Sequence, residues 1–230
     1  IPVMQDLWKG KKNQTVWLFD FNNPQNNSYK AIRQFRVKML EWIGIYEKNI
    51  PDVVVFVNGI PLGVIECKAP TVENALKKWI DQLIRYQREI PKLFWYANML
   101  VSCAGTSWLL YGSTNTPASY YAFWKTVYPY ATEEELKNNI KTIDSPTPQD
   151  VCIHSLFHTG NFLDILQNFT VFENENQKVV KKVARRQQFQ AVRKMVERLA
   201  EWKENGWVVW HTQWSGKSLT MVYAALKTKR

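Results

Sequence analysis

The pattern of hydrophobic and polar positions predicts strands in three early segments of the chain, by alternation in the first and by β-rich apolar runs in the other two. These segments are residues 29–37, residues 51–57 and residues 62–68. The last two flank Asn58 and Gly59, a pair that is typical of tight hairpin turns. The pattern therefore predicts a β-hairpin across this turn, with a further strand before it.

The period changes to that of a helix after residue 70. Thr71 is a suitable N-cap, and Pro91 would stop the helix. Short apolar runs at residues 99–103 and 108–111 predict two more strands, and the polar stretch 113–119 predicts a loop. The helical apolar face consists of Val72, Ala75, Leu76, Trp79, Ile80, Leu83 and Ile84.

Two polar stretches in the second half of the chain are candidate domain boundaries. One is the turn 145–148, which follows a short charged helix expected over residues 133–143. The other, which we favour, is residues 173–177, because a long basic helix is expected from about residue 178 to residue 203. The predicted domains are therefore residues 1–172 and residues 173–230.

The last segment resembles the start of a nucleotide-binding fold. Residues 207–210 have the apolar character of a buried strand, residues 211–218 form a polar loop, and a helical pattern follows. Strand, loop and helix in this order open many α/β domains that bind phosphates at the helix N-terminus.

Composition and charge favour a polyanionic partner in a reducing compartment. The 30 Lys and Arg residues against 20 Asp and Glu residues give a net charge of +10, although basic proteins also occur without nucleic acid. The three cysteines, Cys67, Cys103 and Cys152, are odd in number and set in apolar sequence, which indicates free thiols and a cytoplasmic location. No apolar run approaches the roughly 20 residues of a membrane span.

The hairpin brings chemically useful side chains together. Pairing centred on Gly59 places Asp52 opposite Glu66, so their Cβ atoms would lie about 5 Å apart. Lys68 follows two residues after Glu66 and shares its face, whereas Cys67 points to the other face. We therefore expect Asp52, Glu66 and Lys68 to converge on one point.

Two carboxylates at this distance repel each other unless a cation lies between them. The repulsion is about 3 kcal/mol at an effective dielectric constant near 20. Oxygen ligands suit Mg²⁺ or Mn²⁺, so Asp52 and Glu66 are the predicted metal ligands of a phosphodiesterase site, with Lys68 stabilising developing charge. Glu-x-Lys alone is commonly a solvated surface pair, but the register with Asp52 favours the catalytic interpretation.

These residues resemble the PD-(D/E)xK nuclease motif of the R subunit of type I restriction enzymes. The likeness includes Pro51-Asp52, the turn segment 56–62 and Glu66-Cys67-Lys68. Gln82 and Tyr86, one helical turn apart, match the Q-x-x-x-Y motif of that nuclease branch, although such a pair alone would only mark a helix face. The resemblance assigns Gln82 and Tyr86 a place beside the metal site.

The resemblance continues into an ATP-driven motor. Residues 160–173 resemble the segment that joins nuclease to motor, and Gln188 resembles the glutamine that reads adenine in superfamily 2 helicases. Two positions depart from the family: Trp214 replaces a glycine, and Arg186 replaces an aromatic residue. The residues that resemble the family's ATP-binding set are Gln188, Thr212, Ser215, Gly216, Lys217 and Ser218.

The sequence thus predicts an α/β fold in which a PD-(D/E)xK mixed sheet, flanked by helices, precedes the first strand, loop and helix of a truncated RecA-like domain. By resemblance, the full subunit would bind double-stranded DNA, Mg²⁺ and ATP, and would work with methylation and specificity subunits. The alternatives are a stand-alone or repair-type nuclease of the same fold, and a degenerate nuclease fold that serves only as a DNA-binding or docking module.

Overall fold

The computed structural model describes ten stretches of the chain: residues 2–3, 14–38, 48–68, 75–105, 109–130, 132–140, 146–175, 178–201, 208–209 and 216–229. Its centre is a six-stranded mixed sheet with the strand order β10-β9-β8-β7-β6-β3. β7 and β8 run parallel, and every other neighbouring pair in this sheet is antiparallel. The strands are β3 (Tyr29–Arg33), β6 (Val53–Val57), β7 (Ile60–Lys68), β8 (Met99–Ala104), β9 (Leu110–Gly112) and β10 (Ala122–Phe123).

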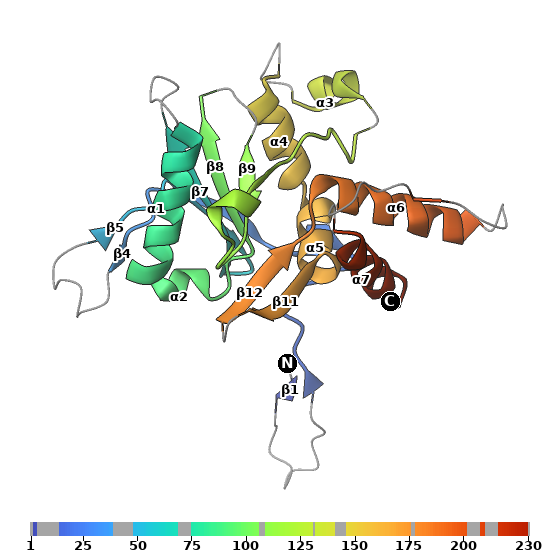
Figure 1. Ribbon diagram of the computed structural model, residues 1–230, viewed down its shortest axis with the longest axis horizontal. Coiled ribbons are helices and arrows are strands. Elements are labelled where there is room, and N and C mark those ends of the chain that lie inside the picture. Colours follow the sequence, from blue (N-terminus) through green and yellow to red (C-terminus); the bar gives the residue numbers. More distant parts are fainter. Residues whose placement is uncertain are drawn as a thin grey trace, which may run out of the picture.

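Helices cover both faces of the sheet, as the sequence predicted (Figure 1). α1 (Ala75–Glu89) and α2 (Pro91–Phe94) pack on one face, where Val54, Val64 and Leu100 contribute to the same apolar cluster as Ile80 and Leu83. α4 (Pro148–Leu156) and α5 (Thr159–Asn168) cover the other face. The remaining elements are β1 (Pro2–Val3), β2 (Gln14–Thr15), the 3-10 helices η2 (Pro24–Asn26) and η3 (Ala118–Tyr120), β4 (Val37–Lys38), β5 (Lys48–Asn49), α3 (Glu133–Asn139), β11 (Thr170–Glu175), β12 (Lys178–Val183), α6 (Arg186–Glu201) and α7 (Lys217–Thr228).

The predicted hairpin forms, but its turn is not centred on Gly59. Asn58 and Gly59 both have positive φ, 50° and 81°, as a two-residue type I′ turn requires. Val57 therefore pairs with Ile60, one position away from the predicted register. A bulge between the pairs of Val55 and Phe56 inserts one residue into β7 and restores the predicted register, so that Val53 faces Ile65.

The predicted amphipathic helix is α1. Ile80 and Leu83 are buried as the pattern indicated, whereas the expected N-cap Thr71 lies outside the described residues. The helix ends at Glu89, and Pro91 begins the short helix α2 instead of a loop.

The prediction of a long basic helix in the second half of the chain was wrong in its first part. The long basic helix does not begin near residue 178: β12 occupies that stretch and pairs with β11, because β-branched Val side chains favour a strand. The helix α6 begins only at Arg186. The hairpin β11–β12 therefore joins residues from both sides of the predicted boundary at 173–177, although residues 176–177 are not described. The turn at 145–148 is in part a helix start, because Thr147 caps α4 and Pro148 is its first residue.

The expected buried strand at 207–210 is also absent from the residues that are described there. Val208 and Val209 have no strand pairing, and Val208 is 87% exposed. A strand in the middle of a parallel sheet needs neighbours on both sides, and within the described stretches none lies beside these two residues. No described helix is long and apolar enough to span a membrane.

Candidate active site

Asp52 and Glu66 interlock at the end of the β6–β7 hairpin. Asp52 directly precedes β6, and one further step from the pair Val53–Ile65 places it opposite Glu66, as the sequence predicted. The Asp52 amide donates to Glu66 Oε1 at 3.3 Å, and the Cys67 amide donates to Asp52 Oδ2 at 2.8 Å. The two carboxylates therefore occupy one small region, each anchored by the backbone of the opposite strand.

Gln82 and Tyr86 complete this group from α1. Gln82 Nε2 donates to Glu66 Oε2 at 3.0 Å and to Tyr86 Oη at 2.7 Å. The bridging amide uses both of its hydrogens, which leaves Glu66 with one oxygen bonded to α1 and the other to the backbone of Asp52. The four residues lie together as the sequence led us to expect.

Lys68 is the last residue of β7, two residues after Glu66. Strand alternation assigns it to the face of Glu66, and Cys67 lies on the opposite face, where it meets Cys103. The Lys68 side chain is outside the described part, so the expected position of its ammonium group stays a prediction.

Burial makes the charge of Glu66 costly. Its side chain is 1% exposed, and removal from water together with the charge of Asp52 raises the pKa of Glu66 to about 8. A cation beside the two carboxylates would offset both effects, because it favours the ionised form. In the described stretches no group of three or more His, Cys, Asp or Glu residues can hold a metal, so further ligands would be carbonyl, water or substrate oxygens. The oxygen-only donor set fits Mg²⁺ or Mn²⁺.

The pairing of Cys67 with Cys103 is a feature that sequence reasoning missed. Both thiols are free, as predicted, but they face each other across the parallel strands β7 and β8, with 2.8 Å between their sulfur atoms. Cys103 donates this hydrogen bond, which lowers the pKa of Cys67. No local pattern could have revealed the contact, because it depends on the register of two strands 36 residues apart.

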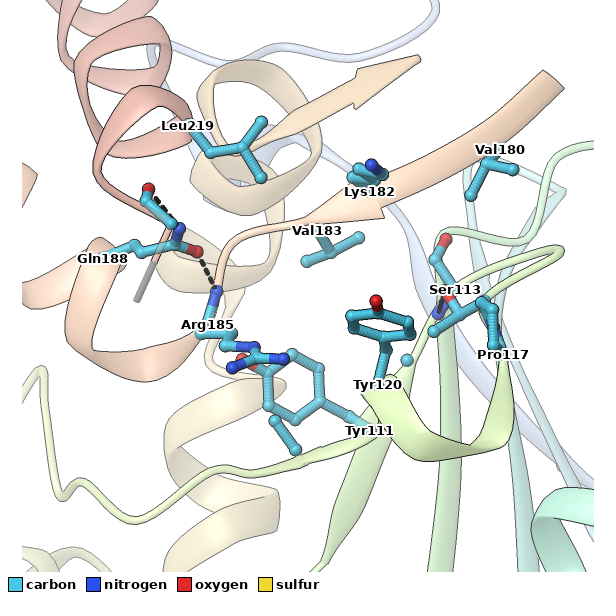
Figure 2. Close-up of a pocket in the computed structure, with 14 residues that line it drawn as sticks. Tyr111, Ser113, Pro117, Tyr120, Val180, Lys182, Val183, Arg185, Gln188 and Leu219 are labelled. Carbon is cyan, nitrogen blue, oxygen red and sulfur yellow. Dashed lines mark hydrogen bonds between the residues drawn. The ribbon is translucent and has the colours of Figure 1, made fainter. Parts of the chain in front are cut away.

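A second group of predicted residues meets around a cavity of about 230 Å³. Gln188 is 3% exposed; its Oε1 accepts from the Arg185 amide at 2.8 Å, and its Nε2 donates to the Gly216 carbonyl at 3.0 Å. Figure 2 shows Gln188 at one end of the cavity, with Leu219 of α7 nearby and Tyr120 further along. A methyl group on Gly216 would lie 2.5 Å from Gln188 Nε2, and its φ of 83° also favours glycine.

The remaining predicted nucleotide-binding residues are only partly described. Lys217 and Ser218 begin α7 and are exposed. Thr212, Ser215 and the unusual Trp214 lie outside the described residues. The structure therefore joins Gln188 to Gly216, and residues 210–215 lie outside its described part.

Sequence reasoning also missed the far wall of the cavity. Residues 113–119 were expected only to form a loop, and Ser113 and Pro117 of this segment line the cavity together with Tyr120 (Figure 2). Ser113 is fully buried, and its Oγ has no hydrogen-bond partner among the described residues. A buried hydroxyl without a partner is energetically costly, and this cost falls on the wall of the cavity.

Comparison with known proteins gives a consistent result for both parts of the chain. Residues 2–119 match the family model described as type I restriction enzyme R protein N terminus, and residues 187–230 match the model of the SWI2/SNF2 ATPase. The "Type I restriction enzyme HindI endonuclease subunit" of Haemophilus influenzae is 32% identical over 225 residues, covering 94% of this chain and 20% of the relative. The "Putative type I restriction enzyme MjaIXP endonuclease subunit" of Methanocaldococcus jannaschii is 29% identical over 232 residues, covering 94% of this chain and 22% of the relative. The chain thus spans about a fifth of the length of these relatives.

Proposed function

The chain belongs to the family of type I restriction enzyme R proteins, of which it carries the N-terminal part, and on this premise we propose that it holds the metal-dependent DNA-cleaving centre of such a subunit. The observation that carries the proposal is the group formed by Asp52, Glu66, Gln82 and Tyr86. In this group a buried carboxylate faces a second carboxylate, and the two are held by backbone hydrogen bonds across the strands and by the amide of Gln82.

Each residue has a separate task in the proposed mechanism. Asp52 and Glu66 would hold Mg²⁺ or Mn²⁺, which when bound polarises the scissile phosphodiester and lowers the pKa of water. Gln82 holds the Glu66 carboxylate in place through its 3.0 Å hydrogen bond and is itself oriented against Tyr86. Lys68 would neutralise the negative charge that builds on the phosphate during attack.

The direct test is cleavage by the full subunit assembled with its methylation and specificity partners on double-stranded plasmid DNA, with Mg²⁺ and ATP. Glu66→Gln keeps the shape of the side chain but removes its charge, and cutting should cease while ATP hydrolysis continues. Glu134→Gln is the matched control, because Glu134 is exposed on α3. Unchanged cutting by Glu66→Gln would overturn the proposed centre.

We also propose that the cavity beside Gln188 takes the base of ATP in the full subunit. Gln188, Gly216, Lys217 and Ser218, with Thr212 and Ser215, would bind the nucleotide, and the helix N-terminus of α7 favours a phosphate. Support comes from the SWI2/SNF2 match over residues 187–230 and from the Gln188–Gly216 bond. As part of the same proposal, residues 187–230 form the beginning of a RecA-like domain.

Two other functions remain as alternative outcomes. A stand-alone or repair-type nuclease would cut DNA without methylation and specificity subunits, whereas a degenerate docking module would bind DNA but never cut it. DNA-cleavage and DNA-binding assays distinguish these two functions from the proposed one. They are carried out on the subunit alone and on its complex with the methylation and specificity subunits, which we expect to form in the cytoplasm. The presence of both carboxylates, with Glu66 buried and hydrogen-bonded, favours an active centre over a degenerate one.

A further inference from the structure

Two thiols lie directly behind the candidate active site. Cys67 stands between Glu66 and Lys68 on β7, and Cys103 faces it from β8 with 2.8 Å between the sulfur atoms. We propose that this pair is a reversible oxidation site, at which a small disulfide of the glutathione class converts the two thiols into a Cys67–Cys103 bridge that slows DNA cleavage. The effect on cleavage rests on the proposed function, whereas bridge formation does not.

The geometry of the strands suits such a bridge. Neighbouring strands lie about 4.8 Å apart, which is within the range of roughly 4.4 to 6.8 Å that Cα atoms of disulfides span. Because Cys67 and Cys103 are direct partners in the parallel register, their side chains leave the sheet on the same face. The sulfur atoms need to approach by less than about 1 Å to reach the bond length of about 2.05 Å.

Accessibility assigns different roles to the two thiols. Cys67 is exposed and can meet a small disulfide in solution, whereas Cys103 is 1% exposed and can react only with its neighbour. Cys152 is also buried, and its Sγ donates to the Trp124 carbonyl at 2.7 Å, whereas Cys103 Sγ donates to Cys67. Cys152 therefore provides an internal control.

The reaction would proceed by two exchanges. The Cys67 sulfur loses its proton to water and attacks one sulfur of the small disulfide, so the old S–S bond breaks and one small thiol leaves. Cys103 then loses its proton and attacks the Cys67 sulfur, which expels the second small thiol. The two protein thiols are oxidised and the small disulfide is reduced to two thiols, so no other oxidant is needed.

A bridge would alter the site because the backbone of Cys67 is part of it. The Cys67 amide donates to Asp52 Oδ2 at 2.8 Å, and Cys103 Sγ contacts the Glu66 carbonyl at 3.3 Å. Pulling residue 67 toward β8 shifts the segment that carries both Glu66 and Lys68. A displacement near 1 Å can cost about 100-fold in rate, so even a partial shift should slow cutting about tenfold.

The first experiment measures the bridge itself. The full subunit is incubated with glutathione disulfide, and intact mass and peptide mass are recorded before and after dithiothreitol. We expect the loss of two hydrogens, a cross-linked peptide pair containing residues 67 and 103, and complete reversal. Cys103→Ser should instead retain glutathione on Cys67, Cys67→Ser should not react at the pair, and Cys152→Ser should behave as the unaltered subunit.

The outcomes separate this inference from the proposed function. An unaltered subunit that stops at the glutathione adduct, does not react, or links Cys152 would overturn the bridge. If the bridged complex cuts DNA as fast as the complex with both thiols free, the bridge does not control cleavage. Each variant is compared with its own dithiol form. A reduced complex that never cuts would contradict the proposed function, but the mass measurement would still decide the bridge.

Discussion

The two candidate sites of this chain are built in different ways. The carboxylate site depends on one hairpin and one helix, and its four residues lie within a stretch from Asp52 to Tyr86. The cavity beside Gln188 collects residues from β9, η3, β12, α6 and α7, which are more than 100 residues apart at the extremes (Figure 2). A site made from neighbouring elements can be located from pattern and register, whereas at the cavity only Gln188 and Gly216 were found, by resemblance, and the opposite wall was missed.

Because the two sites use different residues, a substitution at one site should not impair the other. In the described part of the chain, no hydrogen bond joins Asp52 or Glu66 to Gln188, Arg185 or Gly216. Changes at one site should therefore leave the local chemistry of the other intact, even where the whole complex needs both. The following experiments either confirm or break this separation.

The largest effect is expected from Glu66→Ala. It removes a proposed metal ligand, and the lost charge stabilisation of several kcal/mol corresponds to a fall in cleavage of roughly 100-fold or more. ATP hydrolysis by the assembled complex should stay within about twofold, because the second site is untouched. Cleavage is measured by plasmid linearisation and ATP hydrolysis by phosphate release, both on the same sample. A parallel loss of both activities would show that the two sites are coupled.

Gln82→Ala should have a smaller effect at the same site. Its amide bridges Glu66 and Tyr86 without being a proposed metal ligand, and loss of such an orienting partner typically costs 10-fold to 100-fold in metal affinity or activity. We expect the Mg²⁺ concentration for half-maximal cleavage to rise, with partial rescue by excess metal. Gln87→Ala on the same helix is the control, because Gln87 bonds to Asn115 and not to Glu66. No change in the metal requirement would leave Gln82 a packing residue only.

Gln188→Ala tests the other site. It removes the bonds to the Arg185 amide and the Gly216 carbonyl, so we expect ATP affinity to fall about tenfold, which is about 1.4 kcal/mol. Mg²⁺ binding in the absence of nucleotide, measured by calorimetry, should not change. Gln187→Ala is the neighbouring exposed control. If ATP affinity were retained, the cavity would not be the site of the base.

The same contrast explains how far the sequence could predict this molecule. The register between Asp52 and Glu66 followed from the Asn58-Gly59 turn, although this turn is centred between the two residues and the bulge beside Val55 compensates for the one-residue shift in pairing. Turn chemistry is local, and a bulge leaves no clear mark in the sequence.

The errors lie where tertiary partners decide the outcome. Lys178–Val183 combines charge with β-branched residues and was expected to be helical, but pairing with β11 makes it a strand. Val208 was expected to be buried and is exposed. Ser113 and Tyr120 line the cavity together with residues of β12 and α6, which lie more than 55 residues further along the chain. Local propensity carries no information about such partners.

The smallest effect is a change in how stability depends on pH, and it also tests the carboxylate site without any catalysis. In the folded chain the pKa of Glu66 is raised to about 8 from its usual 4.5 by burial and by Asp52. The folded state then binds the proton more tightly than the unfolded state, so this stabilisation is complete below pH 4.5 and is lost as the pH rises toward 8. With EDTA present, the apparent Tm of the full subunit should therefore decline over this window, and Glu66→Gln should flatten the decline. Mg²⁺ should raise the Tm more at pH 8 than at pH 6, because the cation favours the ionised carboxylate. Equal slopes of Tm against pH for the two proteins would mean that Glu66 does not titrate near neutrality. An equal rise of Tm with Mg²⁺ in the Glu66→Gln variant would mean that Glu66 does not bind the metal.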